Sequence, residues 1–157
     1  MIVSMGYPRA KMDFAPTLAS AQKAHRAGAL AAWCQIFLRG EGASVGLADP
    51  LRERDDDVYV LAEVDLGDVY PITGPEEDFD WPVPPEQFEQ RVEGMVHSLR
   101  AGWDAPPLFV HMHTLRLVDG SHRREALLRT GSRTYWAVMW CRRPPFNGRG
   151  QQVSLDA

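Results

Sequence analysis

The residues with the clearest chemical potential are six consecutive ones, Asp-Gly-Ser-His-Arg-Arg at positions 119 to 124. A strand-like segment ends at Val118, and a helical pattern begins at Ser121. The first amide groups of a helix lack intrahelical acceptors and lie at the positive end of its dipole, so they bind anions, above all phosphate. Glycine lets the backbone approach a ligand closely. We therefore predict a phosphate site formed by Gly120, Ser121, His122, Arg123 and Arg124.

The same six residues also have an ordinary structural interpretation. Asp-Gly is a common turn, Ser121 can cap a helix, and the arginines can be solvated surface residues. Residue types alone leave both interpretations open.

The elements around this turn follow from hydrophobic spacing. We predict one helix or two over residues 18–39, depending on Gly28, then one or two strands over 58–72 and a proline-rich acidic loop over 73–87. An amphipathic helix over 85–101, two short strands over 108–118, a helix over 121–130 and a strand over 134–140 complete the chain. This order indicates an α/β fold with a small mixed sheet and packed helices.

The length and composition of the chain indicate that the predicted helices and strands belong to one compact domain. The chain has 157 residues, 45% of them hydrophobic, and a net charge of −4. Two cysteines and no long apolar run indicate a cytoplasmic protein without a membrane segment. The acidic balance disfavours binding to duplex DNA. Within the domain we expect an N-terminal helical extension (1–57), a core (58–141) and a tail (142–157).

The segment DGSHRREALLRTGSRTYWAVMW resembles the core motif of the ParB/sulfiredoxin superfamily, in which a strand leads through a glycine turn into a helix. VDLGDVYPI resembles the first strand of that superfamily, and FEQRVEGMVHSLRAGWDAPPLFV resembles its helix and following strand. The resemblance spans about residues 58 to 141. It implies a ParB/sulfiredoxin-like fold with nucleotide phosphate held at the turn, and fold alone does not select one activity.

Three branches of that superfamily can be compared with this chain. Sulfiredoxins use ATP and carry a catalytic cysteine where this sequence has Ser121, so redox repair is not expected. ParB proteins bind CTP and centromere DNA, and a downstream helix-turn-helix domain reads the DNA. We do not expect that domain in the sixteen residues after Cys141. The Asp-Gly-x-His-Arg version is most similar to the free serine kinase branch.

The kinase branch implies roles for particular residues. Its acidic base matches the loop that holds Glu76 and Glu77, and either would accept the proton of an acceptor hydroxyl. Asp119 would bind Mg²⁺ or orient His122, and His122 would contact a phosphate. The helix amides and Arg123 would neutralise the transferred phosphoryl group.

The expected function is phosphoryl transfer from ATP or ADP, with CTP as a third candidate nucleotide, to a small hydroxyl-bearing metabolite by a monomer or homodimer. Trp81 and Trp103 are candidates for stacking on a base or substrate. The alternative is a ParB-like module that senses a nucleotide or binds a protein or nucleic acid without catalysis. A metal site at His111, His113 and His122 is a weaker possibility, because strand histidines two residues apart share a face.

Overall fold

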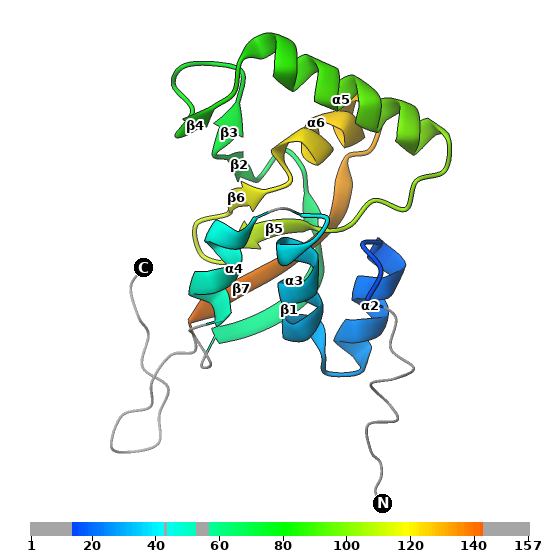
Figure 1. The fold of residues 1–157 in the computed structure, drawn as a ribbon, viewed down its shortest axis with the longest axis vertical. Helices are drawn as coiled ribbons and strands as arrows, with labels where there is room; N and C mark the ends of the chain where they lie inside the picture. Colours follow the sequence, from blue (N-terminus) through cyan, green and yellow to red (C-terminus); the bar gives the residue numbers. More distant parts are fainter. Residues whose placement is uncertain (1–13, 43, 53–56, 143–157) are drawn as a thin grey trace, which may run out of the picture.

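The computed structural model describes residues 14–42, 44–52 and 57–142. The helices are α2 (Leu18–Arg26), α3 (Leu30–Arg39), α4 (Val45–Arg52), α5 (Pro85–Arg100) and α6 (Ser121–Arg129). The strands are β1 (Asp57–Asp65), β2 (Tyr70–Pro71), β3 (Thr73–Gly74), β4 (Trp81–Pro82), β5 (Leu108–His111), β6 (Arg116–Asp119) and β7 (Thr134–Arg142). Figure 1 shows the arrangement.

Five strands form one mixed sheet in the order β1-β7-β5-β6-β2. β1 and β7 are antiparallel over nine residue pairs, and β7 and β5 are parallel. β5 is antiparallel to β6, which is parallel to β2. β3 and β4 form a separate parallel pair of two residues each. The predicted α/β class with a mixed sheet is therefore confirmed.

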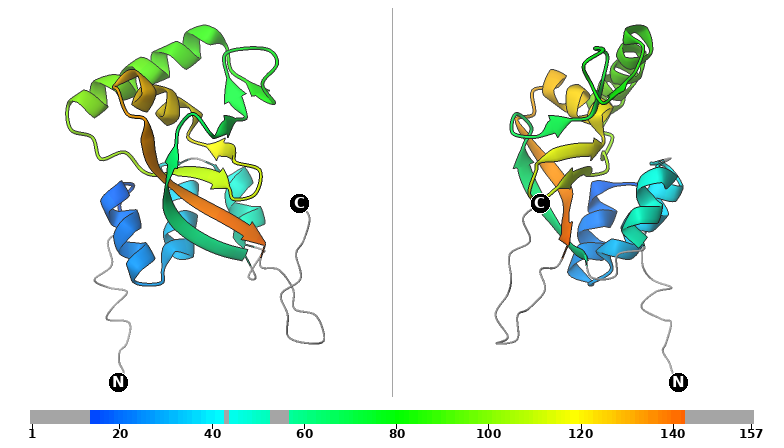
Figure 2. Two further views of the ribbon diagram at one scale, coloured as in Figure 1. Left: turned by 180° about the vertical axis from the view of Figure 1, so that it is seen from behind. Right: turned by 90° about the vertical axis from the view of Figure 1, so that its left-hand side faces the viewer.

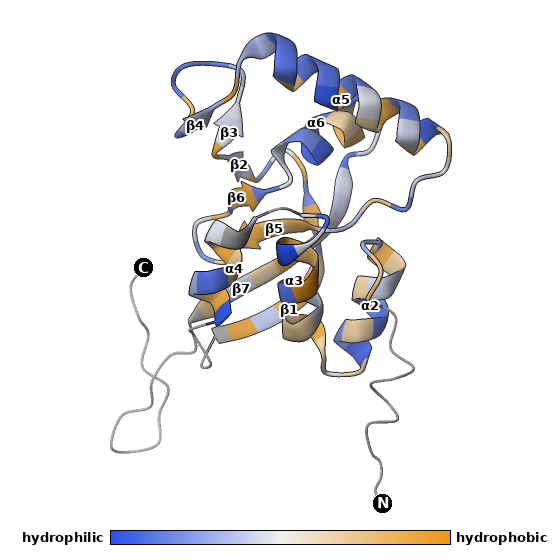
Figure 3. Ribbon diagram, viewed as in Figure 1, coloured by the Kyte–Doolittle hydropathy of each residue, from blue (hydrophilic) through white to orange (hydrophobic). Residues whose placement is uncertain are grey.

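Helices α2, α3 and α4 cover one face of the sheet, as the two views in Figure 2 show. Their buried residues, which include Trp33 and Phe37, form one core with Leu61, Phe109 and Val138 of the strands. Figure 3 shows hydrophobic residues along α3, β5 and β7, where these elements meet. The N-terminal helices are therefore packed into the same core as the sheet.

Helices α5 and α6 lie beside each other at the other end of the molecule (Figure 1). Leu127 of α6 packs on the second face of the sheet with Leu108 and Leu117. Ala126 of α6 packs with Phe88 and Val92 of α5 in a smaller cluster. α6 is therefore held between the sheet and α5, and its N-terminus follows directly from the end of β6.

The predicted element boundaries agree closely with the structure. Residues 18–39 form two helices, because Gly28 has φ +73 and separates α2 from α3. Between α3 and β1 the structure adds the short helix α4. β3 and β4 lie within the segment 73–87, which the proline content predicts to be a loop; each is only two residues long. The predicted tail lies, apart from Arg142, outside the described residues.

No helix in the described ranges combines the length and apolar character needed to cross a membrane.

Replacing Gly120 tests how tightly the turn before α6 is built. Gly120 has φ +106, and a Cβ there would lie 2.7 Å from Leu108 Cδ2 and 2.9 Å from Arg123 Nη2. Gly120→Ala should therefore lower the free energy of unfolding by about 1–3 kcal/mol through backbone strain and overpacking. Urea denaturation measures this change.

Gly94→Ala is the matched control. Gly94 lies inside α5, and a Cβ there would meet nothing within 4 Å. Because alanine has the better helix propensity, this variant should gain roughly 0.5–1 kcal/mol. A Gly120→Ala variant as stable as wild type would contradict the proposed close packing of the turn.

Candidate functional site

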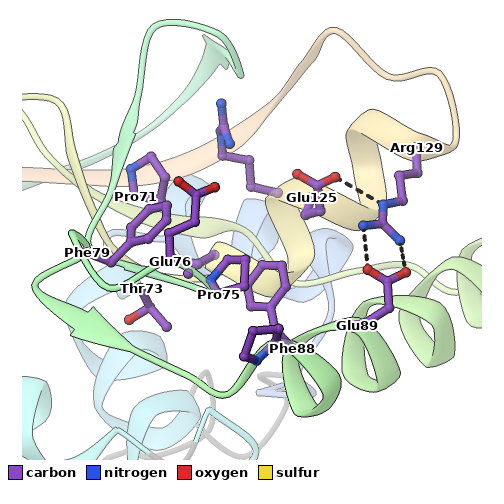
Figure 4. A pocket seen from close by; sticks show the side chains of 13 residues that line it. Pro71, Thr73, Pro75, Glu76, Phe79, Phe88, Glu89, Glu125 and Arg129 are labelled. Atoms are coloured by element: carbon purple, nitrogen blue, oxygen red, sulfur yellow. Dashed lines mark hydrogen bonds and ion pairs between the residues drawn. The ribbon is translucent and has the colours of Figure 1, made fainter.

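A pocket of about 350 Å³ lies where the β3–β4 segment, the start of α5 and one side of α6 meet. Its size falls within the range of small-molecule sites. Figure 4 shows the side chains that surround it. The lining residues are Pro71, Thr73, Gly74, Pro75, Glu76, Phe79, Pro85, Phe88, Glu89, Ser121, Arg124, Glu125 and Arg129.

The loop that brings Glu76 to the pocket is held by a close contact between Gly74 and Phe79. A Cβ at position 74 would lie 2.4 Å from the Phe79 ring, so the ring packs directly on the glycine backbone. The Phe79 amide donates to Glu76 O at 3.2 Å, and the Val83 amide donates to Gly74 O at 2.8 Å. These contacts fix the turn, and the exposed Glu76 carboxylate borders the pocket opposite α6 (Figure 4).

The N-terminus of α6 opens at the edge of this pocket, because Ser121 is both the first helical residue and a lining residue. The N-cap is Gly120, and no side chain caps the helix. The first intrahelical bond runs from the Arg124 amide to Gly120 O at 2.8 Å. The preceding amides of the first turn therefore have no side-chain acceptor in the described part of the chain, as a phosphate cradle requires.

Three of the five charged groups around the pocket, one arginine and two glutamates, pair with one another. Arg129 binds Glu89 in a bidentate pair, with Nη2 donating to Oε1 at 2.9 Å and Nη1 donating to Oε2. Its Nε donates to Glu125 Oε2 at 3.0 Å. Arg129 holds the pKa of Glu89 below its usual range, chiefly by hydrogen bonding. This network ties α5 to α6 and forms one wall of the pocket (Figure 4).

Glu76 and Arg124 are the remaining charged groups. Arg124 donates a hydrogen bond from Nε to Leu66 O at 2.8 Å, which holds its side chain in place. Its two terminal nitrogens have no acceptor among the described residues. The Glu76 carboxylate has no hydrogen-bond or ion-pair partner among the described residues. The Glu76 carboxylate and the Arg124 guanidinium can therefore both contact a ligand beside the N-terminus of α6.

Arg123, which the sequence places among the phosphate ligands, has a structural role instead. It is only 8% exposed, and its Nη2 donates to Pro107 O at 3.0 Å and to Asp119 Oδ2 at 3.3 Å. Its guanidinium carbon lies 5.5 Å from the centre of the Phe37 ring. Arg123 does not line the pocket because its side chain points into the core beneath the N-terminal helices.

Asp119 is likewise occupied by protein contacts. Ser44 Oγ donates to its Oδ1 at 2.8 Å, and Arg123 binds its Oδ2. Within the described ranges no three His, Cys, Asp or Glu residues are grouped as metal ligands. The residues at the turn do not fit the predicted Mg²⁺ site on Asp119, because both carboxylate oxygens already bind this chain's own donors.

His122 packs between α5 and α6 rather than against the pocket space. Its ring lies 4.7 Å from the Phe88 ring, and its Nε2 is buried without a hydrogen-bond partner in the described residues. Burial lowers the pKa of His122 to about 4, helped by the positive charges of Arg91 and Arg123. The imidazole is therefore neutral near pH 7, and nothing places it against a phosphate.

The other predicted site residues are dispersed. Glu77 is exposed and does not line the pocket. Trp81 is 68% exposed on β4, near the loop but outside the lining. Trp103 follows the C-terminal end of α5, whereas the pocket touches the first two turns of that helix, and Trp103 is not a lining residue. His111 and His113 lie 6.0 Å apart, ring to ring, on the hairpin.

Sequence reasoning missed the residues that give the pocket its walls. Phe79, Phe88, Glu89, Glu125 and Arg129 all line it. The spacing of Glu125 and Arg129, four apart on one helix, is a sequence signal for their ion pair. The bond from Arg129 to Glu89 joins residues forty positions apart and has no such signal.

Comparisons with solved structures give similarities to part of this chain. A solved structure described as the C222₁ form of a Pnob8-like ParB-N domain matches with a TM-score of 0.39 and 16% identity, over 54% of this chain and 30% of that chain. The matched part is thus less than a third of the ParB-N chain. No protein-family model matches, and no curated protein sequence does. A similarity of this extent assigns no activity to the chain.

The buried His122 predicts a loss of stability in mild acid. Its pKa is lower in the folded chain (about 4) than the ordinary value of 6.5, so the unfolded chain binds more protons between these values. The contribution is fully present above about pH 6.5 and is lost as pH falls toward 4. After a discount for partial exposure, we expect a loss of roughly 1–2 kcal/mol.

His122→Phe retains a ring against Phe88 and removes the titrating group. Urea midpoints measured at pH 7 and pH 4.5 should fall less with pH in this variant than in wild type. An identical fall in both proteins would show that His122 titrates normally.

Proposed function

We propose that the pocket binds a nucleotide through its phosphates and supports transfer of a phosphoryl group to a small hydroxyl-bearing acceptor. The observation that carries this proposal is the placement of an unpaired carboxylate, Glu76, across one pocket from the uncapped N-terminus of α6 and Arg124. Phosphoryl transfer depends mainly on positioning and on neutralising charge, and these groups supply both.

Each group has a distinct part in this proposal. The amides of the first turn of α6 and the Arg124 guanidinium hold phosphate oxygens, which places Arg124 in the role that sequence reasoning gave to Arg123. Phe79 and Phe88 supply apolar contact surface within the lining. The Arg129 network holds α5 against α6 and keeps the pocket walls in place.

Glu76 accepts the proton of the acceptor hydroxyl. As that proton leaves, the acceptor oxygen forms a bond to the terminal phosphorus, and the bond from phosphorus to the bridging oxygen breaks. The shortened nucleotide leaves with the electron pair of that bond. An exposed carboxylate suits this role because it is free to reach the hydroxyl of a bound acceptor.

Glu76→Gln and Glu77→Gln form a matched pair for testing the proposal. The two glutamates are adjacent and both exposed, but only Glu76 lines the pocket. With ATP, ADP or CTP, magnesium and a panel of hydroxy metabolites, ³¹P NMR should show phosphoryl transfer by wild type. Glu76→Gln should lower its rate by about 10²-fold or more, as loss of a general base does. Glu77→Gln should stay close to wild type.

Equal rates in both variants would remove Glu76 from the mechanism. Saturable nucleotide binding by wild type, measured by calorimetry without any transfer, would contradict catalysis and favour the non-catalytic nucleotide-sensing alternative. One observation supports this non-catalytic alternative. Asp119, His122 and Arg123 contact other parts of the protein and are not directed at a ligand.

A further inference from the structure

The turn that follows β1 holds Arg124, the arginine that lines the pocket. Arg124 Nε donates to Leu66 O at 2.8 Å. Leu66 itself is fixed at two further points. Its amide donates to Arg133 O at 2.9 Å, and its fully buried side chain packs in one cluster with Leu127 of α6. The Leu66 carbonyl can therefore hold the Arg124 side chain in one orientation.

Residues 65–68 form a β-turn, in which the Asp68 amide donates to Asp65 O at 3.0 Å. Neither central residue, Leu66 or Gly67, has a positive φ, and the peptide bonds of the described residues are all trans. Among hydrogen-bonded turns with trans peptides, type I has negative φ at both central positions. The turn is therefore type I, and its central peptide joins Leu66 to Gly67.

The two polar groups of this central peptide have partners on opposite sides. Its N–H, from Gly67, donates to Asp65 Oδ1 at 2.8 Å, and its C=O, from Leu66, accepts from Arg124 Nε. A peptide unit is planar, and in the trans form its N–H and C=O point in opposite directions. The bond from Gly67 to Asp65 therefore also fixes the direction of the Leu66 carbonyl. It polarises the peptide as well, which makes Leu66 O a stronger acceptor.

Loss of the Asp65 side chain would allow this peptide to turn over. Turns of types I and II differ by a half-turn of the central peptide, and type II needs a positive φ at the third position. Gly67 occupies that position, and glycine adopts positive φ without steric cost. In the type II form Leu66 O would point away from Arg124, while the Leu66 amide and side chain would keep their contacts. Arg124 would then be released although the chain stays folded.

We propose that Asp65 is a positioning residue for Arg124, because it holds the peptide between Leu66 and Gly67 in the type I form. Its effect on ligand binding rests on the proposed nucleotide site, whereas its effect on the Arg124 side chain does not. A long side chain that is already held loses less conformational freedom when it binds a phosphate. Asp65 therefore raises nucleotide affinity, although its own negative charge opposes a bound phosphate.

The Arg124 Nε–H signal in ¹H–¹⁵N spectra of the nucleotide-free protein tests this positioning. The signal is assigned by its loss in Arg124→Lys, and the backbone amide signals show that each variant is folded. In wild type it should be sharp and protected from exchange with water. Asp65→Ala should lose this protection, and Asp65→Asn should keep it, because the asparagine side-chain oxygen also accepts from the Gly67 amide. A protected signal in Asp65→Ala would overturn the proposal.

A second substitution, at Gly67, tests the change of turn type. Alanine disfavours positive φ, so Asp65→Ala/Gly67→Ala should return to the type I form and regain the protected signal. The added Cβ would lie 3.2 Å from Asp65 Oδ1 in the wild-type chain, and Asp65→Ala removes that atom. A signal lost in the single variant and still lost in the double variant would show that the peptide does not turn over, and the proposal would fail.

Nucleotide affinity, measured by calorimetry with ATP or ADP and magnesium, gives the functional readout. Asp65→Ala should bind about 3- to 10-fold more weakly than wild type, the cost of ordering one long side chain, and the double variant should bind normally. Asp68→Ala is the matched control, because Asp68 is exposed in the same turn and has the same charge. It should bind at least as tightly as wild type, since it removes only a negative charge.

The two measurements separate this proposal from the proposed function. Equal affinities in Asp65→Ala and Asp68→Ala would overturn the effect of Asp65 on binding. Absence of nucleotide binding by wild type would contradict the proposed function, and the Arg124 signal of the nucleotide-free protein would still decide whether Asp65 positions Arg124.

Discussion

The buried Arg123 guanidinium contacts three separate segments of the chain. It joins the end of β6 at Asp119 to the segment before β5 at Pro107, and it lies over the Phe37 ring of α3. Because a buried arginine is costly unless it is paired, these partners must be in place together. Ser44, which follows α3, completes the set by donating to Asp119. The guanidinium thus adds a polar link to the hydrophobic core that joins the N-terminal helices to the sheet, and this link lies next to the start of α6.

That constraint explains how the turn can serve as a binding site. With Arg123 turned inward and Gly120 in a left-handed conformation, α6 starts without a side-chain cap and presents Ser121 to the pocket. The next arginine, Arg124, lies on a different side of the helix and lines the pocket. The two neighbouring arginines therefore have different roles. Arg123 joins segments of the fold, and Arg124 faces the pocket in which we propose that a ligand binds.

The elements could be predicted from the sequence because local signals define them. Gly28 separates two helices, the spacing from Phe88 to Leu99 defines α5, and Gly120 marks the turn before α6. The roles of the charged residues could not be predicted in the same way. Whether Arg123 or Arg124 faces a ligand depends on packing against Phe37, eighty-six positions away. One of the two glutamates that pair with Arg129, Glu89, is also supplied by another helix. Such contacts leave no trace in local spacing.

We propose that nucleotide phosphates bind at the N-terminus of α6, opposite Glu76. Titrating the ¹⁵N-labelled protein with ATP or ADP and magnesium, and following amide chemical shifts, locates the bound phosphate directly. We predict saturable shifts that are largest for the amides of Ser121 to Arg124, with smaller ones at Glu76. Saturable shifts confined to other parts of the chain, or none at millimolar nucleotide, would contradict it.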